Sequence, residues 1–140
     1  MDNDRELIRR ATEVLNPRRL SPSVEAGDVG SALVTAMGNV YTGVSIDAAC
    51  SLGFCAEHNA IGNMITNGES KVMSIVAVGK DGNILPPCGR CREFLYQIDA
   101  DNAETRVLLG NGTAMKLKEL LPEHWMAKKG GQAKNQKAVR

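Results

Sequence analysis

The N-terminal segment carries apolar residues at helical spacing. They recur three and four positions apart, on one face of a helix: Leu7, Ile8, Ala11, Val14 and Leu15. Asp2 or Asn3 can cap the start of such a helix, and Pro17 would stop it. The pattern therefore predicts an amphipathic helix over residues 2–15. Residues 16–30 hold two prolines and two glycines, and we expect them to be irregular.

Strand and helix patterns alternate along the rest of the chain. Four runs rich in apolar and β-branched residues predict strands: residues 31–36, 40–46, 72–78 and 106–109. Three segments have the apolar spacing of helices: residues 55–66, 88–98 and 115–121. Residues 47–54 are expected to form a loop, and the nearly continuous apolar run at 72–78 is typical of a central strand buried on both faces. This order predicts an α/β fold, a three-layer α-β-α sandwich with one mixed sheet.

The composition is that of an ordinary globular protein of 140 residues, with 43 % hydrophobic and 24 % charged residues. Five basic residues and no acid fall in the last thirteen positions, so residues 1–127 carry a net charge of about −4. We expect residues 1–127 to form a single domain and residues 128–140 to be a basic, disordered tail. An acidic body is a poor match for a groove that follows nucleic-acid phosphates.

The targeting signals of a secreted or membrane protein are not evident. The N-terminus is polar and acidic, and no apolar run approaches the length of a membrane span. The four cysteines then read as thiols or metal ligands in a reducing compartment, and we expect a cytoplasmic protein with no membrane partner.

Three cysteines and one carboxylate are the candidate chemistry of the chain. Cys55 and Glu57 are two residues apart, and Cys88 and Cys91 are three apart in the run Pro87-Cys88-Gly89-Arg90-Cys91. At a helix start, Cys88 and Cys91 would lie on one face and could bind one ion. Zinc held by three protein ligands keeps a fourth position open for chemistry.

The fourth cysteine leaves a structural alternative. Cys50 could complete a closed four-cysteine zinc site, and the chain would then be a non-catalytic binding module. The spacing Cys50-x₄-Cys55 departs from the C-x₂-C pairs usual in such modules, and this site would leave Glu57 without a role. We interpret Cys50 instead as a small buried thiol.

The Cys55-Ala56-Glu57 and Pro87-Cys88…Cys91 motifs resemble those of the cytidine deaminase family, in the small three-cysteine branch that includes blasticidin-S deaminase. The resemblance runs from about residue 28 to residue 125. It implies one Zn²⁺ per subunit, held by the three cysteines, with Glu57 as the acid and base that moves protons. The implied reaction is hydrolytic deamination of cytidine or deoxycytidine in pyrimidine salvage, or of a modified cytosine nucleoside of the blasticidin-S type. It also implies a homotetramer with shared active sites.

The same resemblance assigns substrate contacts. The backbone N–H of Ala56 corresponds to the family's donor to the cytosine O2 atom. Ser45 and Asp47 stand where the family has Asn and Glu that hold the ribose hydroxyls, and both side chains here are shorter. Gly27 stands where the family has an aromatic residue. These departures leave the identity of the sugar open.

Cationic residues flank the expected zinc ligands. Three thiolates on Zn²⁺ leave a net charge of −1, which His58, Arg90 and Arg92 are placed in sequence to offset. The family motif usually has Arg at the position of His58, whose protonation we hypothesise to tune the site. A nucleic-acid editor would need a positive surface and stacking residues, and the 4 % aromatic content argues against it. A small nucleoside is therefore the expected partner.

Overall fold

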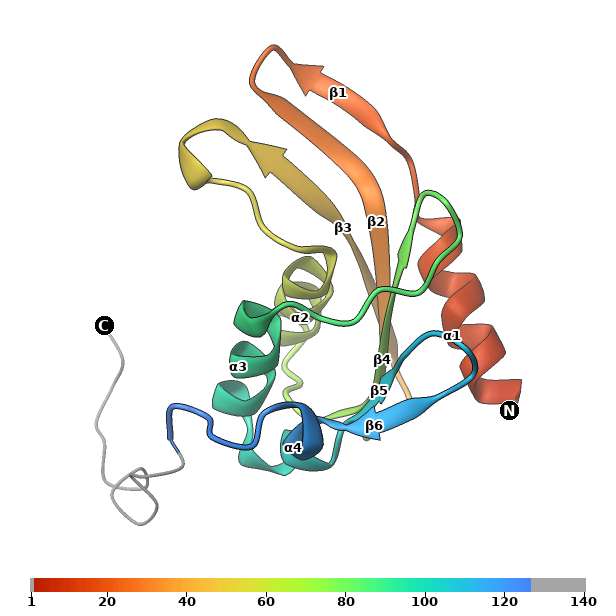
Figure 1. The fold of residues 1–140 in the computed structure, drawn as a ribbon, viewed down its shortest axis with the longest axis vertical. Coiled ribbons are helices and arrows are strands. Elements are labelled where there is room, and N and C mark those ends of the chain that lie inside the picture. Colours follow the sequence, from red (N-terminus) through yellow and green to blue (C-terminus); the bar gives the residue numbers. More distant parts are fainter. Residues whose placement is uncertain (1, 127–140) are drawn as a thin grey trace.

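The computed structural model describes residues 2–126 of the chain (Figure 1). The expected tail at 128–140 lies outside the described residues. The elements, in chain order, are α1 (Asp2–Glu13), β1 (Arg18–Ser21), β2 (Val24–Thr35), β3 (Val40–Ala48), η1 (Ala49–Ser51), α2 (Ala56–Thr66), β4 (Val72–Gly79), α3 (Gly89–Ile98), η2 (Ala100–Glu104), β5 (Arg106–Leu108), β6 (Ala114–Lys116) and α4 (Leu117–Leu120).

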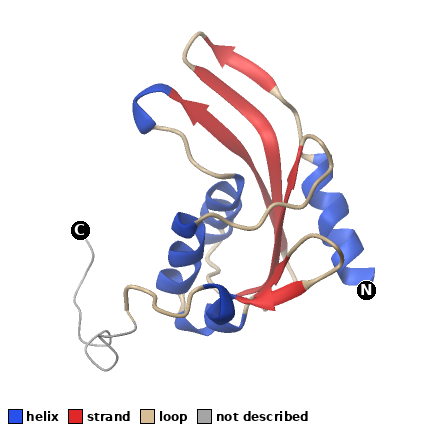
Figure 2. Ribbon diagram, in the orientation of Figure 1, coloured by secondary structure: helices blue, strands red, loops and turns tan. Residues whose placement is uncertain are grey.

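The strands form one mixed sheet around the long strand β2. β3 pairs along one edge of β2, while β1 and then β4 pair along the other edge. β4 and β5 are parallel, and every other pairing is antiparallel. α1 covers one face of the sheet, and α2 and α3 cover the opposite face (Figure 2). The predicted α-β-α sandwich with a mixed sheet is confirmed.

Side chains that alternate along the strands supply two apolar cores, one on each face of the sheet. Leu33 of β2 and Ile75 of β4 face α2 and α3, where they pack with Ile61, Met64 and Leu95. The adjacent residues of the same strands face α1 and pack with its buried residues; this second core contains Leu7, Ala11, Ala32, Val76, Val78 and Leu108. The predicted helical face at the N-terminus is thus the face that α1 buries.

Two predicted segments differ from the structure because their strands are defined by backbone pairing and not by a run of apolar residues. Residues 16–30 were expected to be irregular, yet β1 and the first half of β2 form a hairpin around Pro22. A bulge between Ala26 and Gly30 interrupts the register of β2 with β3, and Gly27 adopts a φ of +88° there. Proline and glycine mark the turn and the bulge of this hairpin and hide the strand pattern.

Residues 115–121 were expected to form one helix, but they begin as a strand. β6 pairs with β5, with Met115 opposite Val107, and α4 spans only Leu117–Leu120. In the segment expected as a loop, β3 continues to Ala48 and η1 follows it. In both places the sheet extends beyond the run of apolar residues because backbone pairing with a neighbouring strand overrides local propensity.

The helix α2 lies closely against β3, which pairs with no strand other than β2 in the described chain. Gly43 permits this approach, since a Cβ atom there would be 2.4 Å from the backbone nitrogen of Ala60. Asn59 and Asn63, one turn apart on α2, donate from Nδ2 to the carbonyl oxygens of Val44 at 3.1 Å and Thr42 at 3.4 Å. The outer edge of β3 is therefore covered by helix side chains.

A buried amide joins the end of α3 to the start of β4. Asn102 is 1 % exposed, and its Oδ1 accepts the backbone N–H of Val72 at 2.8 Å. Its Nδ2 donates to the carbonyl oxygens of Ser70 and Leu95, each at 2.9 Å. One side chain thus satisfies three backbone groups that would otherwise be unpaired in the interior.

Within residues 2–126, none of the helices has both the length and the apolar composition required to cross a membrane.

Candidate zinc and nucleoside site

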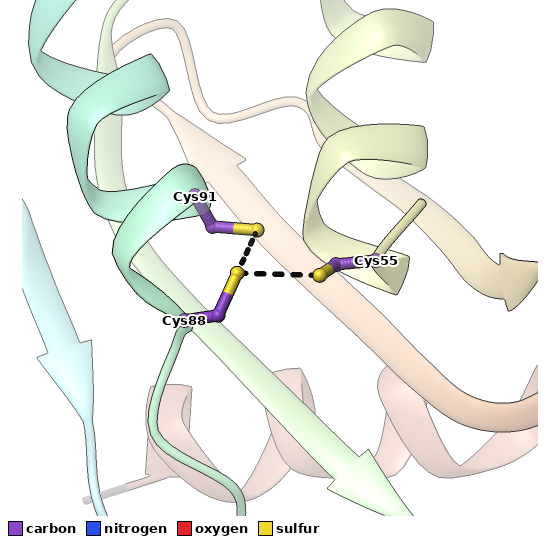
Figure 3. A group of neighbouring side chains, drawn as sticks. All are labelled: Cys55, Cys88 and Cys91. Carbon is purple, nitrogen blue, oxygen red and sulfur yellow. Dashed lines mark hydrogen bonds between the residues drawn. The ribbon is translucent and has the colours of Figure 1, made fainter. Parts of the chain in front are cut away.

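Three cysteines meet where α2 and α3 begin. Cys55 and Cys88 occupy the N-cap positions of these helices, and Cys91 lies in the first turn of α3. The Sγ of Cys88 is 3.3 Å from that of Cys55 and 3.5 Å from that of Cys91 (Figure 3). Both N-cap residues have the extended φ and ψ angles that are typical of N-caps.

The sulfur arrangement fits a zinc ion. All three Sγ atoms lie within 4.8 Å of one another. A tetrahedral zinc with Zn–S bonds of about 2.3 Å would hold its sulfurs about 3.8 Å apart, so small side-chain adjustments suffice. Among the described residues, this group has no fourth His, Cys, Asp or Glu member, so the fourth position is left for a non-protein ligand.

Cys50 does not belong to this group. It is exposed and lies in η1, where its φ is +61°. The expectation of a small buried thiol is wrong, because β3 continues to Ala48 and places Cys50 in the turn beyond the strand end. The closed four-cysteine alternative is therefore not formed.

Burial and mutual repulsion act on the three thiols. Burial raises the pKa of Cys91, and Glu57 and the neighbouring thiols raise it further. Burial and a hydrogen bond with Cys88 raise the pKa of Cys55. Burial alone would raise the pKa of Cys88. Hydrogen bonds from the backbone N–H of Cys91, from the other two thiols and from the N–H of Arg90 outweigh burial, so the pKa of Cys88 is lowered. Helix N-termini favour a thiolate, and a cation at the centre would allow all three to ionise.

Glu57 lies in the first turn of α2 and is 5 % exposed. Burial raises the pKa of its carboxyl group. A carboxyl that exchanges its proton closer to neutrality is suited to general acid and base work. Glu57 reaches a cavity of about 660 Å³ that opens beside the cysteines, and Cys55 and Cys88 also line this cavity.

The three expected substrate contacts, Ser45, Asp47 and Ala56, all line the cavity. Their environments differ. Asp47 is exposed, whereas Ser45 is 9 % exposed and its Oγ accepts the backbone N–H of Val29 at 3.0 Å. Val29 belongs to the bulge of β2, so the Ser45 oxygen already completes the sheet at the point where the register shifts. Its hydroxyl hydrogen and one acceptor lone pair remain for a ligand.

The three cationic residues expected around the ligands take different positions. Arg90 is exposed and lines the cavity. Nδ1 of His58 lies 3.2 Å from Sγ of Cys91, and the imidazole ring stacks on Phe94 with centroids 4.5 Å apart. Burial, and then the charge of Arg90, lower the pKa of His58.

Arg92 does not contact the sulfurs. Its Nε donates to the carbonyl oxygen of Pro87 at 2.9 Å, and its Nη1 donates to that of Leu120 at 3.1 Å. It therefore ties the residue before Cys88 to the end of α4, and any influence on the ligands passes through the backbone.

Sequence reasoning missed further residues that line the cavity. Leu85 and Pro86 come from the loop before Cys88, Asp28 from the bulge, and Phe54 from the position before Cys55. The sequence held one signal for three of these residues, because Phe54, Leu85 and Pro86 come shortly before Cys55 or Cys88 and line the same cavity. The bulge residue could not be found this way because it comes from a pairing distant in sequence.

Comparison with known proteins agrees with this geometry. Residues 1–105 match the family model described as the cytidine and deoxycytidylate deaminase zinc-binding region. A cytidine deaminase of Halalkalibacterium halodurans is 36 % identical over 84 residues, which are 59 % of this chain and 62 % of that protein. The match thus spans less than two thirds of that relative's length. A blasticidin-S deaminase of Bacillus cereus is 29 % identical over 128 residues, 85 % of this chain and 89 % of that one.

Solved structures of similar proteins share the fold. The crystal structure of cytidine deaminase from Mycobacterium tuberculosis superposes with a TM-score of 0.74 at 25 % identity, covering 88 % of this chain and 97 % of that one. Cytidine deaminase from Mycobacterium leprae gives a TM-score of 0.73 at 27 % identity, covering 86 % and 98 %.

Proposed function

Because the chain belongs to the cytidine and deoxycytidylate deaminase zinc-binding family, we propose that it hydrolyses the amino group of a cytosine nucleoside. Cytidine or deoxycytidine would give uridine or deoxyuridine and ammonia. The observation that carries the proposal is the meeting of Cys55, Cys88 and Cys91 beside the buried carboxyl of Glu57, in a cavity large enough to hold a nucleoside.

The residues of the site have distinct roles in this reaction. Zinc bound by the three thiolates supplies Lewis-acid activation of water. Glu57 takes a proton from the attacking water as its oxygen bonds to C4, and delivers that proton to N3 of the ring. Glu57 then moves the second proton of the added oxygen to the amino group. The C4–N bond breaks, ammonia leaves, and C4 keeps the oxygen as a carbonyl. The N–H of Ala56 donates to O2 and orients the ring.

One observation favours a modified nucleoside as a second candidate substrate. The Oγ of Ser45 is used by the N–H of Val29, and Asp47 is exposed at the cavity edge. Neither side chain is long, so a sugar with an additional polar group would use the space better than ribose. The blasticidin-S deaminase of B. cereus, which the chain matches over 89 % of that protein's length, supports this alternative.

The proposal extends to the oligomeric state and the cellular compartment of the protein. We propose a homotetramer with shared active sites and one zinc ion per subunit. Exposed apolar side chains on several elements are available for contacts between subunits: Met37, Ile65 and Met73. All four cysteines are free, and the metal site needs reduced thiols, which supports a cytoplasmic location. A cytidine or deoxycytidine substrate would give the enzyme a role in pyrimidine salvage.

The test is ammonia release from cytidine, deoxycytidine, cytosine and blasticidin S by the zinc-loaded protein. Glu57→Gln is the matched blank, because it keeps the shape of the side chain and removes the proton acceptor. Release from cytidine that is lost in Glu57→Gln supports the main proposal, and release from blasticidin S alone selects the alternative. No release from any of them, with zinc bound, would contradict deamination of these nucleosides.

A further inference from the structure

A second, smaller cavity adjoins the candidate site at the end of β3. Its volume is about 220 Å³, and it shares Asp47 and Ala48 with the larger cavity that Glu57 and two of the cysteines line. Its other walls come from the β1–β2 hairpin. The hairpin and the end of β3 extend beyond the starts of α2 and α3, so the smaller cavity lies outward of the cysteines (Figure 1).

Three charged side chains stand in a row across the strands at the smaller cavity. Arg19 of β1 lies opposite Glu25 of β2, and Glu25 lies opposite Asp47 of β3. Residues directly opposite each other in an antiparallel pair project from the same face, and all three line this cavity. Nη2 of Arg19 donates to Oε1 of Glu25 at 2.6 Å. These two side chains offset each other's charge, which leaves the charge of Asp47.

The carboxylate of Asp47 is exposed and has no hydrogen-bond or ion-pair partner within residues 2–126. Asp28, another carboxylate that lines the larger cavity, lies 3.3 Å from Nζ of Lys80. Among the described residues, Arg90 is the one cation that lines the larger cavity, and in the chain it lies between two of the cysteines. The uncompensated charge where the two cavities meet is therefore negative.

A cytosine nucleoside bound for deamination would direct its sugar toward this junction. C4 and N1 are opposite atoms of the pyrimidine ring, so a base with C4 at the cysteines points its sugar away from them. On β3, Ile46 pairs with Phe54, the residue before Cys55, through N–H···O bonds of 2.9 and 3.0 Å. The strand continues outward from this pair to Asp47 and Ala48. A substituent on the sugar is thus within reach of the smaller cavity.

We propose that the smaller cavity receives a cationic substituent of the sugar, an ammonium or guanidinium group, and that Asp47 is the specificity-determining residue that selects it. The inference rests on the proposed function and names the charge of the preferred substrate. A cation at the junction gains the attraction of a carboxylate that has no other partner, whereas an anion meets its repulsion. Because the junction is exposed, solvent and salt screen this interaction, and the effect on specificity is several-fold.

The experiment compares four substrates of the zinc-loaded protein at low salt: cytidine, 3′-amino-3′-deoxycytidine, 5′-amino-5′-deoxycytidine and the 5′-carboxylic acid of cytidine. The pH is one at which both amino groups are protonated. The value of kcat/KM for the better amino compound should exceed that for cytidine about fivefold, and the value for the acid should fall below it by a similar factor. Both differences should shrink in about 0.5 M salt.

Three variants assign the preference to its residues. Asp47→Asn keeps the shape of the side chain, and the ratio of kcat/KM for the better amino compound to that for cytidine should fall to about one. Asp101→Asn removes an equal charge outside both cavities and should keep the ratio of the unaltered protein. Glu25→Gln leaves the cation of Arg19 uncompensated beside the smaller cavity and should lower the ratio. A ratio within one variant is insensitive to a general loss of active protein.

Each other outcome has a defined meaning. If neither amino compound exceeds cytidine, the inference is overturned and the proposed function stands. If the preference persists in Asp47→Asn, another charge selects the substrate and the inference fails. An unchanged ratio in Glu25→Gln would place the cation outside the smaller cavity and overturn that assignment. No ammonia release from any of the four compounds would overturn the inference together with the proposed function.

Discussion

Replacing Asn102 by alanine should destabilise the fold strongly, although the residue lies outside the candidate site. The change removes one acceptor and two donor bonds, made at 2.8 and 2.9 Å inside the protein. It leaves the N–H of Val72 and the carbonyl oxygens of Ser70 and Leu95 without partners in a place that is 1 % exposed. Each lost bond costs about 1 kcal/mol, and unsatisfied buried groups add to this, so we expect a loss of about 3–4 kcal/mol.

The assay is urea unfolding followed by circular dichroism at a fixed zinc concentration, because bound metal stabilises the folded state by mass action. With an m value of about 1.5 kcal/mol/M, the midpoint should fall by roughly 2 M urea. Asn67→Ala is the matched control: its amide donates to the carbonyl oxygen of Asn63 at 2.8 Å at an exposed position, and its loss should shift the free energy of unfolding by less than about 0.5 kcal/mol. A similarly small shift in Asn102→Ala would refute the reasoning that the buried amide stabilises the junction of α3 and β4.

Three further changes test other features. Cys91→Ser should lower zinc content and, since metal binding contributes to folding, lower the melting temperature more than Cys50→Ser, whose thiol is exposed; equal shifts for the two would contradict the metal site. Gly43→Val should cost several kcal/mol in urea unfolding because its Cβ would lie 2.4 Å from the nitrogen of Ala60, and a midpoint equal to that of Gly110→Val, where nothing lies within 4 Å, would argue against the close approach. Burial alone would raise the pKa of Asp99. Hydrogen bonds from the backbone N–H of Asp101 and from the side chains of Lys71 and Ser70 outweigh burial and lower that pKa below its ordinary value of 3.8. The stabilisation by Asp99 should therefore be complete above its ordinary pKa and disappear as the pH falls through the lowered one, so unfolding curves of the protein and of Asp99→Asn should converge in acid; a constant difference would disprove this.

Local patterns predict the elements whose burial shows as a regular pattern of apolar residues. The helical spacing that ends with Leu7 and Ala11 in contact with the sheet, and the apolar run of β4, both depend on neighbouring residues. β1, the start of β2 and β6 were not predicted because their strand character comes from backbone pairing with a neighbouring strand, which their own residue types do not show. A bulge at Gly27 and a turn at Pro22 even weaken the local strand signal.

The same distinction between local patterns and strand pairing applies to the candidate site. The two cysteine motifs lie at helix starts, so their spacing indicates a common ligand cluster before any fold is known. The engagement of Ser45 with the N–H of Val29 depends on the register of β2 and β3, which residue types alone do not specify. Phe54 was treated as the end of a loop because an aromatic before a cysteine has no motif of its own.

The asparagines of α2 that cover β3 have a consequence beyond the packing of one helix. An uncovered outer strand offers its backbone groups to strands of other molecules, and such pairing begins aggregation. In this chain, Asn59 and Asn63 occupy carbonyl oxygens on β3, and Gly43 lets the helix lie directly over the strand. A foreign strand could add here only by displacing both amides and the helix that carries Glu57. α2, which carries the Glu57 carboxyl at the cavity, therefore also prevents strands of other molecules from pairing with β3.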